Sequence, residues 1–74
     1  MRSHEITAEL VATIGSVAVA VGDRVAPGDT LVILESMKME IPVLAEVAGV
    51  IREVAVHAGD TVGEGDVIAV IETA

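Results

Sequence analysis

The sequence predicts an all-β fold, a flattened sandwich of two antiparallel sheets related by a pseudo-twofold axis. Of its 74 residues, 53% are hydrophobic, yet there is no Phe, Tyr or Trp. The interior must therefore be filled by Val, Ile, Leu and Ala, and the β-branched members of this set favour strands. An internal repeat and regularly spaced Gly-Asp pairs are the other two observations that support this fold.

The repeat relates residues 8–35 to residues 45–72 at an offset of 37 without a gap, with 12 of 28 positions identical. Short aliphatic strands resemble one another by chance, but Gly-Asp pairs at matching spacing do not arise so easily. We expect residues 1–74 to form a single domain of two equivalent β-units, because neither unit can bury its apolar face alone.

Each copy contains the same elements in the same order. Segments 16–21 and 52–57 alternate apolar and other residues with period two, which predicts strands with one buried face. Segments 31–34 and 67–71 are short apolar runs that suit buried strands. Glycine tolerates positive φ and aspartate bonds nearby backbone amides, so four Gly-Asp pairs are predicted to be turns; they begin at Gly22, Gly28, Gly59 and Gly65. No helix of useful length is predicted.

The connector between the copies has the sequence Glu-Ser-Met-Lys-Met-Glu, residues 35–40, and contains Lys38, the only lysine. Under the offset of 37, Lys38 corresponds to Met1 and to the position after Ala74. The connector is therefore expected at one end of the domain, as a tight hairpin, with the termini at the other. Met-Lys is a poor turn dipeptide, and a broken local rule often marks a functional site. In the alternative interpretation, Met37 and Met39 alternate into the core and Lys38 faces water.

This hexapeptide resembles the attachment motif of the biotinyl/lipoyl attachment domain family, whose biotinyl members carry Met-Lys-Met. The Gly-Asp turns, Ala45 and Gly49 also stand where the family places its turns, so that the resemblance covers about residues 5–71 and most resembles short, free-standing biotin attachment proteins. Lipoyl domains usually carry Asp-Lys-Ala or Asp-Lys-Val instead. The sequence departs from the family at Ser36, often alanine, at Glu9 and Glu46, often proline, and in having Ala12 where the second copy has Gly49.

The resemblance implies a barrel-sandwich hybrid of two four-stranded sheets with the attachment lysine on a hairpin turn. It implies a biotin carboxyl carrier with biotin attached to Lys38 by a biotin protein ligase, and with Met37 and Met39 contacting the cofactor and its partners. The partners implied are biotin carboxylase and carboxyltransferase components, and the chain itself would have no catalytic group. The insertion that forms a thumb in some bacterial carriers is lacking, which leaves open how the cofactor is shielded. A lipoyl carrier and an unmodified β-barrel interaction module remain alternatives.

Charge and composition exclude several other classes of function. The formal net charge of −8 disfavours nucleic acid and anionic membranes as partners, and no apolar run reaches membrane-spanning length. With no cysteine and no signal-peptide pattern, we expect a cytoplasmic protein. We also expect it to be a monomer in isolation. His4 and His57 lack metal-ligand partners at useful spacing, and His57 is expected to be an ordinary strand residue. The Gly-Asp pairs do not form a phosphate-binding loop or a calcium site.

Overall fold

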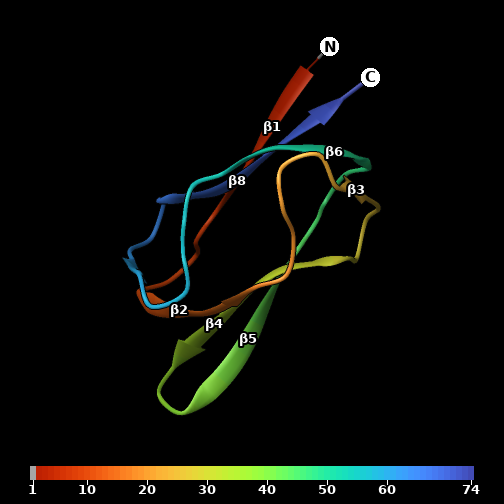
Figure 1. The fold of residues 1–74 in the computed structure, drawn as a ribbon. Helices are drawn as coiled ribbons and strands as arrows, with labels where there is room; N and C mark the ends of the chain where they lie inside the picture. Colours follow the sequence, from red (N-terminus) through yellow and green to blue (C-terminus); the bar gives the residue numbers. More distant parts are fainter. Residues whose placement is uncertain (1) are drawn as a thin grey trace.

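The computed structural model describes residues 2–74, and these form eight strands in two layers (Figure 1). One sheet has the order β1-β8-β6-β3 and the other β5-β4-β2-β7, with every pair antiparallel. No helix of membrane-spanning length and hydropathy occurs in this part of the chain. The strands are β1 (Arg2–Thr7), β2 (Ala12–Val17), β3 (Arg24–Val25), β4 (Thr30–Ser36), β5 (Met39–Leu44), β6 (Gly49–Val54), β7 (Thr61–Val62) and β8 (Val67–Thr73).

The predicted pseudo-twofold relation between two four-stranded sheets is confirmed. Adding 37 to the bounds of β1, β2, β3 and β4 gives the bounds of β5, β6, β7 and β8. The same shift turns the strand order of one sheet into that of the other, because β8 and β6 take the places of β4 and β2. Strands β1 and β5 obey this relation although they share no identical residue at the offset. Their equivalence is therefore a property of the fold that the sequence repeat does not reveal.

The four Gly-Asp pairs form four equivalent turns, as predicted. In the first, the backbone N–H of Asp23 donates to the carbonyl of Ala20 at 3.0 Å, and the N–H of Ala20 donates to Asp23 Oδ2 at 2.8 Å. Gly22 has φ of 97° and Gly59 has φ of 95°, the left-handed region that a type II turn requires at its third residue. Two hydrogen bonds per turn hold the chain where it passes between the sheets.

The core consists only of aliphatic side chains, and no buried polar or charged residue occurs in residues 2–74. It divides into two clusters that the pseudo-twofold largely exchanges. Ile14 and Leu34 belong to one cluster, and their counterparts Ile51 and Ile71 belong to the other. Each of these four side chains is at most 1% exposed. Without aromatic residues, the domain obtains its stability from many small contacts between the two sheets.

The predicted strands 16–21 and 52–57 are wrong in their bounds, because β2 ends at Val17 and β6 at Val54. The N–H of Ala18 still donates to the carbonyl of Leu31 in β4 at 2.8 Å; the chain then crosses to the other sheet, where the N–H of Gly22 donates to the carbonyl of Ile51 at 2.8 Å. Alternating burial continues through the crossing, but the ladder of hydrogen bonds does not. His57 is consequently an exposed turn residue, and its backbone N–H donates to Asp60 Oδ2 at 2.8 Å.

The molecule is elongated, with principal extents of 37 × 18 × 17 Å. Arg2 pairs with Thr73, so the two ends of the described chain lie side by side (Figure 1). The β4–β5 hairpin projects at the opposite end in the same view. Met1, whose position was also predicted from the repeat, lies outside the described residues. The arrangement places the turn between the two copies as far from the termini as the fold permits.

Candidate functional site

The β4–β5 hairpin ends in a two-residue turn made of Met37 and Lys38. Ser36 and Met39 are the last paired residues of the two strands. Met37 has φ of 52° and Lys38 has φ of 64°, and they are the only non-glycine residues with positive φ in residues 2–74. Positive φ at both central residues is the signature of a type I′ turn, the form whose twist matches antiparallel strands. Lys38 therefore lies at a protruding hairpin tip, as the repeat predicted.

This turn is built from residues that disfavour its backbone conformation. Type I′ turns are usually formed by Asn-Gly or Gly-Gly, because a Cβ atom in the left-handed region costs roughly 1–2 kcal/mol per residue. The strain is tolerated because β4 and β5 are paired without interruption below the turn, from Val32 opposite Val43 to Ser36 opposite Met39. A strained turn on a paired hairpin holds the backbone of Lys38 in a defined position.

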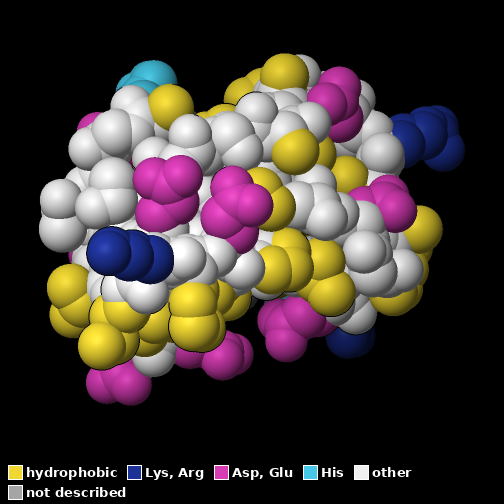
Figure 2. Space-filling view, turned by 90° about the horizontal axis from the view of Figure 1, so that it is seen from below, with side chains coloured by type: hydrophobic (Ala, Val, Ile, Leu, Met, Phe, Trp, Pro, Cys, Tyr) yellow, Lys and Arg dark blue, Asp and Glu magenta, His cyan; other side chains and the backbone are white. Residues whose placement is uncertain are grey.

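The side chains at the tip project into solvent. Met37 is 92% exposed and Met39 is 59% exposed, and Lys38 is also exposed. The alternative interpretation, with both methionines in the core, is therefore wrong. Figure 2 views this end of the molecule, where hydrophobic and acidic side chains lie beside isolated cationic ones. Such a tip offers an accessible amine between two soft, polarisable side chains.

Acidic residues flank the tip, and none of the ion pairs within residues 2–74 involves them. Glu35 and Glu40 are direct cross-strand partners, one step below the turn. The Glu35 side chain lies over Gly15, where an added Cβ would come within 2.8 Å of Glu35 Cγ. At the opposite end, the counterpart of Gly15 is Arg52, whose Nε lies 3.8 Å from Glu72 Oε2. The pseudo-twofold is thus broken in charge, and the hairpin end is the more acidic of the two.

The donor chemistry of the site suits a group attached through an amide. An exposed primary amine on a flexible four-carbon stem is the nucleophile that an acyl group requires. No ion pair to Lys38 forms within residues 2–74, so its amine is not already engaged. In contrast, no group of three or more side chains that could bind a metal ion comes together in residues 2–74. His4 instead pairs with Glu46, with 3.2 Å between Nε2 and Oε1.

Comparison with known proteins gives a family match over nearly the whole chain. The family model described as "Biotin-requiring enzyme" matches residues 3–71. A curated relative from Mycolicibacterium smegmatis, named biotinylated protein TB7.3 homolog, is 57% identical over 42 residues. That stretch covers 57% of this chain and 59% of the relative, so the match spans about three fifths of the relative's length.

Two solved structures resemble the fold closely. The urea carboxylase of Kluyveromyces lactis superposes with a TM-score of 0.90 and 33% identity, covering 97% of this chain and 6% of that one. A single-chain, multi-domain long-chain acyl-CoA carboxylase superposes with a TM-score of 0.87 and 35% identity. The match covers 96% of the present chain and 7% of the carboxylase chain. The chain therefore corresponds to one small part of each of these much longer proteins.

Proposed function

The chain belongs to the biotin-requiring enzyme family, and from this membership we propose that it is a biotin carboxyl carrier with biotin attached to Lys38. The observation that carries the proposal is the placement of the only lysine, exposed, at the tip of the hairpin within Met-Lys-Met. We take residues 1–74 as one biotinyl domain containing the repeat of 8–35 and 45–72.

The chain's own residues present the cofactor and take no part in bond breaking. In attachment, Lys38 Nζ attacks the carboxyl carbon of an activated biotin, an amide forms, the activating group leaves and the amine loses a proton. Lysine amines are protonated at neutral pH, so the ligase must assist that proton's departure. Bound biotin supplies a ureido nitrogen that accepts a carboxyl group and gives it up again. Met37 and Met39 offer adaptable apolar contacts to each partner in turn.

Catalysis then belongs to other polypeptides or domains. The proposed partners are a biotin protein ligase, a biotin carboxylase and a carboxyltransferase, and the relation to two carboxylases supports this set. A tethered carrier raises the effective concentration of the carboxyl group at both active sites. We also propose a cytoplasmic location, in keeping with the lack of cysteine, which cell fractionation would test.

Intact mass of the protein purified from its native host, with a streptavidin blot, tests the proposal directly. Lys38→Arg should remove both signals and leave the far-UV circular dichroism spectrum unchanged. The matched control moves the amine elsewhere: Lys38→Arg combined with Arg24→Lys keeps one exposed lysine, on β3, and should also stay unmodified. Biotin found on either variant would overturn the assignment of Lys38, and a lipoyl mass on the native protein would overturn the choice of cofactor.

A further inference from the structure

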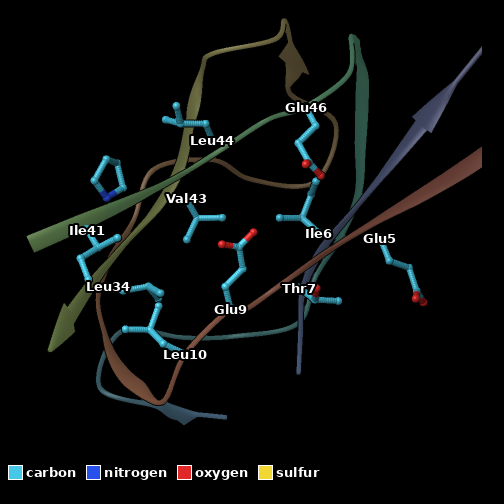
Figure 3. A pocket seen from close by; sticks show the side chains of 11 residues that line it. Glu5, Ile6, Thr7, Glu9, Leu10, Leu34, Ile41, Val43, Leu44 and Glu46 are labelled. Carbon is cyan, nitrogen blue, oxygen red and sulfur yellow. The ribbon is translucent and has the colours of Figure 1, made fainter. Parts of the chain in front are cut away.

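A groove of about 420 Å³ lies between β5 and the segment that joins β1 to β2 (Figure 3). Four pairs of residues equivalent at the offset of 37 line it: Glu5 with Pro42, Ile6 with Val43, Thr7 with Leu44 and Glu9 with Glu46. The groove therefore straddles the pseudo-twofold axis. We propose that it is a resting site for the biotin ring carried on Lys38, an inference that rests on the proposed function.

A continuous apolar path joins Lys38 to this groove. Side chains alternate across a strand, so Met39, Ile41 and Val43 lie on the same face of β5. Ile41 and Val43 are half-buried and line the groove, and Met39 continues the same row to the turn. Leu34, paired with Ile41, supplies part of the floor.

The arm formed by the lysine side chain and the biotin chain is long enough to reach the groove. Ile41 lies three residues beyond Lys38, about 10 Å along an antiparallel strand. From the lysine Cα to the biotin ring there are about eleven bonds, which extend to roughly 13 Å. The ring would thus lie over the mouth of the groove when the arm folds back across Met39.

The chemistry of the groove complements both halves of biotin. Its floor is aliphatic, with Leu10, Leu34 and Ile41, and suits the thioether ring and alkyl chain. Figure 3 shows the Glu9 side chain reaching between Val43 and Ile6, with the Glu46 carboxylate beside Ile6. Glu46 Oε1 already pairs with His4 Nε2 at 3.2 Å, so Glu9 and Glu46 Oε2 are the acceptors that remain. The two ureido N–H groups of biotin are donors, so hydrogen bonds to these carboxylates would be charge-assisted.

The same carboxylates would distinguish biotin from biotin that carries a carboxyl group. A ring that has accepted a carboxyl group has one ureido N–H fewer and an added negative charge, so Glu9 and Glu46 repel it. The groove would hold biotin between reactions and release it once it is loaded. The groove would give the ring shelter that the exposed hairpin tip does not.

Three measurements on the full chain test the inference. Intact mass first establishes that biotin is present. Methyl NMR then compares the unmodified and biotinylated proteins, and we expect shift changes at Leu34, Ile41 and Val43. Avidin capture provides a rate: if the ring rests in the groove about two thirds of the time, Glu9→Gln/Glu46→Gln should speed capture about threefold. The matched control, Glu53→Gln/Glu64→Gln, removes the same charge from exposed positions outside the groove and should leave the rate unchanged.

The outcomes separate this inference from the proposed function. Absence of biotin by mass would overturn the function and the resting site together. Biotin present, with shift changes confined to residues 36–40, would overturn the resting site alone. Equal capture rates for the two double variants would do the same. The comparison of unmodified and biotinylated wild type needs no substitution, so it decides the question even if a variant folds poorly.

Discussion

Met37→Asn should stabilise the protein while weakening its use as a carrier. Met37 is 92% exposed, so removing its side chain loses little packing, and its φ of 52° is one that asparagine tolerates far better. Relief of this left-handed strain should raise the free energy of unfolding by about 1 kcal/mol. For a domain of this size that corresponds to a rise in Tm of about 4–8 °C. The expected cost is a slower biotinylation by the ligase, because the soft contact beside Lys38 is gone.

Thermal and urea unfolding should be followed by far-UV circular dichroism, since the chain has no aromatic residue to report by fluorescence. The matched control is Met39→Asn, which makes the same chemical change in strand β5, where asparagine has poor β propensity. That variant should be less stable than the wild type by several tenths of a kcal/mol. If Met37→Asn were no more stable than wild type, the turn would not be strained and the argument from its backbone conformation would fail.

Three further predictions follow from the same structure. The double variant Met37→Leu/Met39→Leu should change the free energy of unfolding by less than about 0.5 kcal/mol. It should nevertheless lower the kcat/KM of the ligase and of the carboxylase for the carrier. Unchanged kinetics would mean that the two methionines have only a structural role. Gly49→Ala should lower the free energy of unfolding, measured in urea, by more than about 2 kcal/mol. The added Cβ would lie 2.4 Å from the Glu72 carbonyl oxygen. A variant as stable as the wild type would contradict this packing. With a net charge of −8, kcat/KM of biotinylated carrier in a biotin carboxylase reaction should fall steeply with salt while kcat changes little; a salt-independent kcat/KM would leave solubility as the role of the charge.

The fold and the location of Lys38 could be predicted from the sequence because both depend on local or repeated signals. The Gly-Asp turns are local: Gly22 supplies the positive φ and Asp23 bonds the N–H of Ala20 within the same four residues. The pseudo-twofold follows from two copies of one unit. Lys38 at the end opposite the termini then follows from the repeat, since a twofold that exchanges the copies exchanges the connector with the chain ends.

Only the tertiary structure decided the features that depend on distant partners. Strand β2 ends at Val17 because, after a last bond from the N–H of Ala18 to Leu31, the chain changes hydrogen-bond partners from one sheet to the other. The alternating sequence continues unchanged through that point. The equivalence of β1 and β5 is invisible at the offset of 37, since backbone pairing makes each of them a strand and no shared residue does. The groove arises in the same way: Glu9 and Glu46 are far apart in sequence and both line it only because the pseudo-twofold packs one sheet against the other. A turn is determined by a few adjacent residues, whereas strand pairing and cavities depend on residues that meet only after the chain has folded.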